Sequence, residues 1–208
     1  MKLRVSIAAA IASLAIAASA NAASLSIVGG TDVALPADYN PTPPVAGTGP
    51  GTIVRSFTSA QIAFGGLMLD MASKVTYTYI AKQANAQNYA IALPSGMSLS
   101  NKGPLNASFS VADDGGFVDF LFRTISSGAQ ISDITNGVGA TGPLGSRLDV
   151  AFLQESGKSV LAFFDDGRGD SDYDDMVIRI SVVPLPAGGL LLLTALGGFA
   201  AMRRRKTV

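Results

Sequence analysis

Lys74–Ile80, with the sequence KVTYTYI, alternates between two kinds of side chain with a period of two. In an extended chain the two tyrosines fall on one face together with Val75, and the threonines fall on the other face. Aromatic and β-branched residues of this kind favour strands. The run therefore predicts a β-strand that buries one face, and the fold class follows from the repetition of such strands along the chain.

Further short β-prone runs follow towards the C-terminus. The predicted strands are residues 107–111, 117–123, 148–154, 159–164 and 176–182. The first two flank Asp113-Asp114-Gly115-Gly116 and the next two flank Glu155-Ser156-Gly157-Lys158, so each pair is expected to form a hairpin. Short strands, polar turns and no long amphipathic helix predict an all-β domain, either an antiparallel β-sandwich or a jelly roll.

Two stretches before these strands are less regular. Residues 61–73 are apolar and fit either a buried strand or a short helix. Residues 34–52 contain five prolines and three glycines, so no regular element is expected there. We therefore expect residues 23–52 to form an N-terminal segment and linker, and residues 53–182 to form one sandwich domain.

The first 22 residues have the pattern of a secretory signal peptide. Lys2 and Arg4 precede an apolar run over residues 5–18, and Ala20-Asn21-Ala22 offers a cleavage site of the small-x-small type. We expect a signal helix that signal peptidase removes, which leaves a mature chain starting near Ala23.

The last 26 residues combine three features in order. The motif Val183-Pro184-Leu185-Pro186-Ala187 comes first, an uncharged run to Met202 follows, and the basic cluster Arg203-Arg204-Arg205-Lys206 comes next. The 16 residues from Ala187 to Met202 would form a helix of about 24 Å. This length is short for a bilayer core of about 30 Å. The pattern predicts a marginal transmembrane helix, with the cations in the cytoplasm and the preceding chain outside.

This order of prolyl motif, helix and basic stop resembles the tripartite PEP-CTERM sorting signals of Gram-negative bacteria, specifically the VPLPA variant. The resemblance implies export, a transient intermediate in the inner membrane, and recognition near Pro184–Ala187 by an exosortase-type membrane peptidase. The protein would then reach the cell surface or the extracellular space. A permanent single-span anchor is the alternative interpretation of the same tail.

Charge and composition exclude several classes of function. Six of the 15 basic residues lie in the two terminal segments, whereas all 15 acidic residues lie between them, so the exported domain carries a net charge near −6. This charge argues against a nucleic-acid partner. The chain has no Cys and no His, which excludes thiolate nucleophiles, sulfur-ligated zinc, imidazole metal sites and Ser-His-Asp triads.

The candidate site is an acidic segment, residues 165–175, between two predicted strands. Its six carboxylates within eleven residues are those of Asp165, Asp166, Asp170, Asp172, Asp174 and Asp175. A loop between adjacent strands brings these like charges together, where they repel unless a cation neutralises them. Calcium takes six to eight oxygen ligands in flexible geometry, so we expect a calcium site. A solvated acidic turn without an ion is the alternative.

The acidic segment is not an EF-hand loop. Asp170, Asp172 and Asp174 alternate as in its first half, but Asp175 stands where that loop requires Gly and Ser181 where it requires Glu.

The segment instead resembles a calcium-associated domain of unknown function that is common in exported bacterial proteins, often directly before a PEP-CTERM-type signal. The pattern D-x-G-x-G-D-x-D-[FY]-[ND]-D is matched by Asp165, Gly167, Gly169, Asp170, Asp172, Tyr173, Asp174 and Asp175. Asp174 stands where that family often has Asn.

These features favour a non-enzymatic protein of the cell surface or extracellular matrix, associated with biofilm or exopolysaccharide and stiffened by calcium. One alternative is a carbohydrate-binding module, in which Phe163, Phe164 and Tyr173 could stack on sugars. Another is a glycan hydrolase that uses paired carboxylates.

Overall fold

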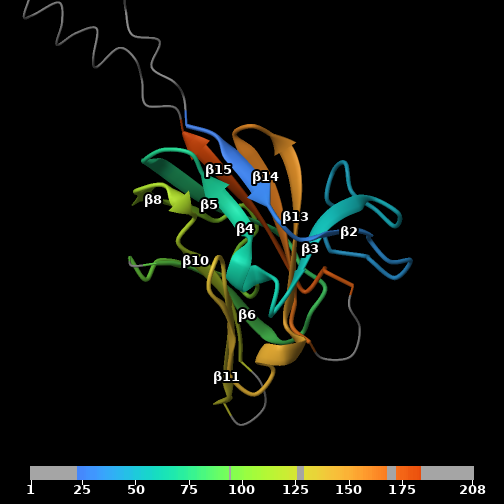
Figure 1. The fold of residues 1–208 in the computed structure, drawn as a ribbon. Helices are drawn as coiled ribbons and strands as arrows, with labels where there is room; N and C mark the ends of the chain where they lie inside the picture. Colours follow the sequence, from blue (N-terminus) through green and yellow to red (C-terminus); the bar gives the residue numbers. More distant parts are fainter. Residues whose placement is uncertain (1–22, 94, 126–128, 168–171, 184–208) are drawn as a thin grey trace, which may run out of the picture. The chain divides into compact units, whose positions relative to one another are not determined.

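The computed structural model describes residues 23–93, 95–125, 129–167 and 172–183, and these form an all-β, antiparallel domain (Figure 1). The predicted signal peptide and residues 184–208, which include the predicted transmembrane helix, lie outside the described residues. In the described part of the chain, no helix is long and apolar enough to span a membrane.

The largest sheet has seven strands. In spatial order they are β2 (Thr31–Ala34), β3 (Ile53–Thr58), β13 (Asp149–Ser156), β14 (Ser159–Asp165), β15 (Met176–Val183), β5 (Ser73–Ala81) and β8 (Ser108–Asp113). The predicted strand at residues 74–80 is confirmed as β5, and its tyrosines are buried as the alternation requires. The predicted last strand is confirmed as β15.

Two smaller sheets complete the domain. The five-stranded sheet has the order β12 (Gly139–Thr141), β11 (Ile131–Thr135), β10 (Phe120–Ile125), β6 (Gln87–Ala92) and β7 (Ser98–Ser100). The three-stranded sheet has the order β1 (Leu25–Val28), β4 (Gly66–Leu69) and β9 (Gly116–Phe117), and the 3₁₀ turns are η1 (Ile62–Phe64) and η3 (Gly145–Arg147). The ambiguous residues 61–73 thus contain both a helical turn and a strand.

The main core lies where the sheets face one another, which is consistent with a sandwich. Phe122 of β10 stacks on Phe164 of β14 with ring centroids 4.9 Å apart and an interplanar angle of 6°. Tyr77 of β5 approaches Phe120 of β10 at 6.1 Å. Because each such ring is fully buried, each contributes about 1.5–3 kcal/mol through its removal from water.

A second apolar layer covers the other face of the seven-stranded sheet. Leu35, Tyr39 and Val45, from the proline-rich stretch, pack in one cluster with Phe163 of β14 and Val177 of β15. The stretch forms no strand beyond Ala34, as expected, but residues 23–52 contain β1 and β2 and belong to the same compact unit as the rest of the domain. The central strands are therefore buried on both faces, which explains their continuous apolar sequence.

The predicted hairpin between residues 107–111 and 117–123 is wrong, although both strands exist. β8 pairs with β5 of the seven-stranded sheet, whereas β10 pairs with β6 and β11 of the five-stranded sheet. The carboxylate of Asp113 accepts hydrogen bonds from the amides of Gly115 and Asp119, both at 3.0 Å. Gly115 and Gly116 have φ of +91° and +93°, which only glycine adopts easily. The chain turns a corner between two sheets there.

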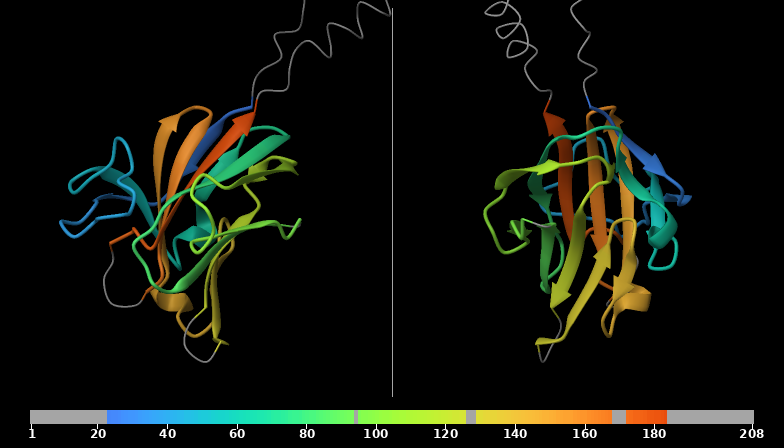
Figure 2. Two further views of the ribbon diagram at one scale, coloured as in Figure 1. Left: turned by 180° about the vertical axis from the view of Figure 1, so that it is seen from behind. Right: turned by 60° about the vertical axis from the view of Figure 1, so that its left-hand side comes forward.

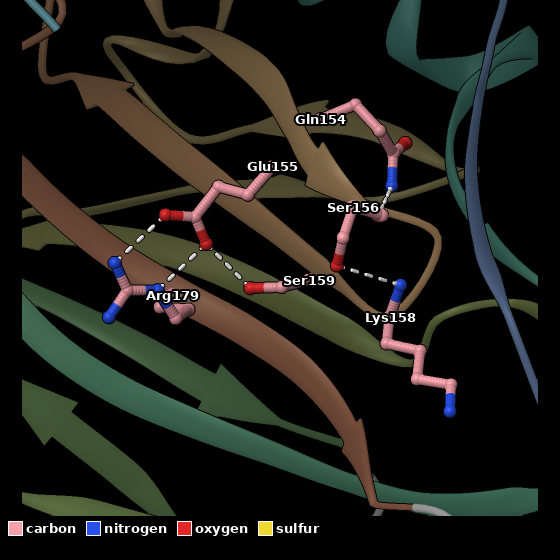
Figure 3. Close-up of polar contacts among 6 residues, drawn as sticks. All are labelled: Gln154, Glu155, Ser156, Lys158, Ser159 and Arg179. Atoms are coloured by element: carbon pink, nitrogen blue, oxygen red, sulfur yellow. Dashed lines mark hydrogen bonds and ion pairs between the residues drawn. The ribbon is translucent and has the colours of Figure 1, made fainter. Parts of the chain in front are cut away.

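The second predicted hairpin is confirmed as β13–β14. An ion pair reinforces it on the outer surface, where the carboxylate of Glu155 accepts two hydrogen bonds of 2.8 Å from Arg179 of β15 and one from Ser159 (Figure 3). Three adjacent strands are thus joined at this end of the sheet.

The two ends of the described domain and the acidic loop lie at opposite ends of β14. The amide of Leu25 bonds to the carbonyl of Gly157 and the amide of Val182 to that of Lys158, so both ends of the domain meet the β13–β14 turn. Figure 2 shows the start of β1 and the end of β15 together at the top of both views. The acidic loop leaves the other end of β14, seven residues away, or roughly 23 Å at the rise of a strand.

Candidate functional site

The acidic segment connects β14 to β15, and the aspartates that the structure describes in it are buried. Exposed fractions are 1% for Asp165, 2% for Asp166, 2% for Asp172, 0% for Asp174 and 9% for Asp175. The sixth predicted residue, Asp170, lies outside the described residues. Burial of five described carboxylates is contrary to a solvated acidic turn, because ionised carboxylates are rarely buried without a compensating charge or hydrogen bonds.

Hydrogen bonds within the segment close it on itself. The amide of Asp166 donates to Oδ2 of Asp175 at 2.6 Å, which joins the end of β14 to the start of β15. The amide of Gly167 donates to Oδ1 of Asp165 at 2.8 Å. At 3.4 Å, the amide of Asp174 makes a longer contact with Oδ1 of Asp172. These contacts hold the two ends of the segment together.

Other parts of the chain also reach the loop. The amide of Asn40 donates to Oδ2 of Asp174 at 2.6 Å, and the amide of Gln83 donates to the carbonyl of Asp174 at 2.7 Å. From β6, Nδ2 of Asn88 lies 3.4 Å from Oδ2 of Asp166. The proline-rich stretch, the residues after β5 and the five-stranded sheet all meet at the acidic segment.

Tyr173 anchors the segment in the second apolar layer. Its φ is +62°, a conformation that a bulky residue adopts rarely and at a cost of about 1–3 kcal/mol. Its ring is 7% exposed, and its hydroxyl shares a hydrogen bond of 2.7 Å with Oγ of Ser56 on β3. Packing and this hydrogen bond together hold the backbone in the conformation that turns the flanking carboxylates inward.

The carboxylates raise one another's affinity for protons. Burial, together with repulsion from Asp149, Asp172 and Asp166, raises the pKa of Asp165 to about 7. Burial raises the pKa of Asp175 to about 8, with repulsion from Asp166, Asp165 and Asp172. The amides of Gly167 and Asp166 oppose these shifts, since each donates a hydrogen bond to one of the two carboxylates.

Asp149 belongs to this cluster, and the sequence prediction missed it. It is the neighbour of Asp165 in the register of β13 and β14, so both side chains lie on the same face of the sheet. Burial raises its pKa to about 6. The predicted hairpin already contained this information. If Gln154 pairs with Val160, the same antiparallel register continued away from the turn sets Asp149 opposite Asp165.

The residues present fit a hard cation in their chemistry. Asp165 Oδ2 is buried and has no hydrogen-bond partner among the described residues, and a buried polar atom without a partner costs about 1–3 kcal/mol. Oxygen ligands alone are what calcium prefers. Within residues 23–93, 95–125, 129–167 and 172–183, however, no three carboxylates are already arranged as a metal-binding group. These side chains would have to move to hold an ion.

The aromatic residues considered for sugar stacking do not form a platform. Phe163 and Phe164 are fully buried on opposite faces of β14, and Tyr173 is almost fully buried in the second apolar layer. Asp165 and Asp175 are likewise largely buried, at 1% and 9% exposed.

Of the predicted sorting residues the structure describes only Val183, which ends β15 and is 45% exposed. Pro184, Leu185, Pro186, Ala187, Arg203, Arg204 and Arg205 lie outside the described residues. No known protein family, curated protein or solved structure matches this chain.

Proposed function

We propose that this chain is an exported, non-enzymatic protein of the cell surface or extracellular matrix, whose β-domain is stabilised by calcium at the acidic loop. The observation that carries the proposal is the burial of five carboxylates in one loop. Their mutual repulsion in a poorly solvated place destabilises the fold unless protons or a cation compensate. Calcium is abundant outside cells and binds such oxygens without demanding regular geometry.

The residues that would hold the ion are Asp165, Asp166, Asp172, Asp174 and Asp175, with Asp149 contributing charge from the neighbouring strand. When bound, the ion supplies the positive charge that the cluster lacks. The loop joins β14 to β15 and contacts Asn40, Gln83 and Asn88. Ordering it therefore stabilises contacts in both large sheets.

Delivery to the exterior rests on the sequence of the two termini. The signal peptide directs export, and the Val183–Ala187 motif with its basic stop makes the chain a substrate of an exosortase-type peptidase in the inner membrane. The domain ends at Val183, at the opposite end of β15 from the acidic loop. Processing at the tail would thus leave the proposed ion site untouched.

The test is the dependence of thermal unfolding on divalent ions. An ion that binds only the folded state at a hundredfold excess over its Kd stabilises it by about 2.7 kcal/mol, which corresponds to a rise in Tm of roughly 5–10 °C for a domain of this size. Calcium should raise the Tm of the purified protein, magnesium should raise it less, and chelator should reverse the rise.

A double variant links this response to the loop. Changing Asp172 and Asp174 together to Asn should flatten the calcium response and partly stabilise the protein in chelator, because repulsion is relieved. The exposed Asp114→Asn change is the matched control and should leave the calcium response intact. Equal melting of wild type and double variant, with calcium and with chelator, would rule out the metal site.

A further inference from the structure

Asn88 is a buried polar residue where the main core meets the acidic loop. It lies on β6 and is 0% exposed, on the same face of the strand as Ala90 and Ala92, which belong to the main core. A primary amide buried among apolar groups is destabilising unless its donors and acceptor find partners. The position of Asn88 therefore depends on what its side chain can bind.

The side chain of Asn88 is only partly satisfied. Its Nδ2 lies 3.4 Å from Oδ2 of Asp166, which is long for a hydrogen bond. Its Oδ1 has no hydrogen-bond partner among the described residues. The same holds for Oγ1 of Thr124, the residue directly opposite on β10, and for Oδ2 of Asp165, next to Asp166 in the loop. Buried oxygens without partners thus lie on both sides of the junction between the five-stranded sheet and the acidic loop.

An amide can present either end to a neighbour. Its oxygen and nitrogen are alike in size and shape, so a half-turn about the Cβ–Cγ bond exchanges them. With carboxylates alone beside it, the nitrogen faces Asp166, as the structure shows. With a cation beside Asp166, the oxygen is the favoured end, and carbonyl oxygens of Asn are ordinary calcium ligands. A neutral ligand suits a site that already holds several carboxylates, because it adds coordination without adding repulsion.

We propose that the amide oxygen of Asn88 is a ligand of the cation held by the acidic loop, so that one ion joins the five-stranded sheet to the seven-stranded sheet. This inference rests on the proposed calcium function and deepens it. The ion then orders more than the loop between β14 and β15. It also fixes β6 and, because β6 pairs with β10, the centre of the five-stranded sheet.

A measurement on the unaltered protein tests this coupling. Amide hydrogen exchange, compared with calcium chloride and with chelator, should slow both in residues 165–175 and in β6 and β10. Protection confined to the loop and to the strands β14 and β15 that flank it would overturn the inference and leave the calcium site standing. No protection anywhere, together with no change in Tm, would overturn both.

Two variants test the ligand itself by calorimetric titration with calcium chloride. Asn88→Leu keeps the branching and the number of heavy atoms but removes the oxygen, and calcium binding should weaken by about tenfold or more in Kd, the effect of losing about 1.4 kcal/mol. Asn88→Asp keeps an oxygen at this position and should bind calcium at least as tightly as the wild type does.

Asn101 provides the matched controls. It is also buried, but its Oδ1 accepts from the amide of Asn88 and its Nδ2 donates to the carbonyl of Ala86, so its amide is already used. Asn101→Leu should destabilise the fold with little change in calcium affinity, and Asn101→Asp should raise that affinity less than Asn88→Asp does. Equal effects at the two positions would overturn the assignment of Asn88 as a ligand, and so would loss of binding in Asn88→Asp.

Discussion

Asp149 and Asp165 stand opposite each other on β13 and β14, so two carboxylates point to the same side of the seven-stranded sheet. Like charges in directly opposed positions destabilise a sheet. Burial adds to this effect, since it raises the pKa of Asp149 to about 6 and that of Asp165 to about 7. The pair marks the point where the acidic loop begins and where its charge spreads beyond the loop itself.

Replacing Asp149 by Asn should stabilise the protein in chelator by about 0.2–1 kcal/mol, the range for cross-strand pairs. The same change should weaken calcium binding, because it removes one negative charge from the cluster. Urea unfolding in chelator and calcium titration check the two effects. Asp114→Asn, which alters an exposed carboxylate, should change stability by less than about 0.5 kcal/mol. A less stable Asp149→Asn protein in chelator would contradict the repulsion argument.

The stability of the protein in chelator should fall as the pH rises. The ordinary pKa of an aspartate is 3.8, and in the folded domain the pKa rises to about 7 for Asp165 and to about 8 for Asp175. Below about pH 4 both carboxyl groups are protonated in the folded and in the unfolded protein, so they contribute nothing to the pH dependence of stability. Between pH 4 and 8 the folded state binds more protons, so the free energy of unfolding decreases by up to about 1.4 kcal/mol per pH unit for each group.

Urea midpoints at several pH values in chelator measure this slope. Asp175→Asn should flatten it, while the amide oxygen of the new side chain can still accept from the amide of Asp166. Saturating calcium should also reduce the slope, because the ion binds the ionised carboxylates. A protein that becomes more stable from pH 5 to pH 8 in chelator would show that the buried carboxylates are not protonated as described.

The hydrogen bond between Tyr173 and Ser56 should stabilise the loop. Tyr173→Phe and Ser56→Ala should each cost about 1–2 kcal/mol, because each removes one partner of a buried pair. The double variant should cost less than the sum of the two, which a double-mutant cycle measures. Tyr39→Phe is the control: it removes a hydroxyl that bonds to Thr48 at 3.0 Å in the same apolar layer. Its effect should add to that of Ser56→Ala without coupling.

Changing Pro184 and Pro186 to Ala should leave export intact and block processing of the tail. The motif carries the resemblance to sorting signals, whereas the signal peptide alone directs export. Mass spectrometry of the mature protein, from cells with the matching membrane peptidase, would detect the retained segment. Normal processing of the double variant would remove the sorting proposal and leave the calcium site unaffected.

Local patterns in the sequence predicted six of the fifteen strands that the described residues form. The alternation in β5, the turn between β13 and β14, and the strand after the acidic segment all depend on neighbouring residues, and the structure confirms them. The grouping of acidic residues between two adjacent strands likewise predicted that they would come together. Periodicity and turn chemistry act within a few residues, so these features could be predicted from the sequence alone.

Which strands pair, and what lies beneath the loop, depended on contacts between distant parts of the chain. The turn at residues 113–116 resembles a hairpin turn, yet Asp113 and two glycines make it a corner between sheets. Asn40 and Asn88 reach the acidic loop from two separate segments. Only the tertiary packing of the proline-rich stretch and of the five-stranded sheet brings them there, because such burial is a property of the folded chain and not of any local run.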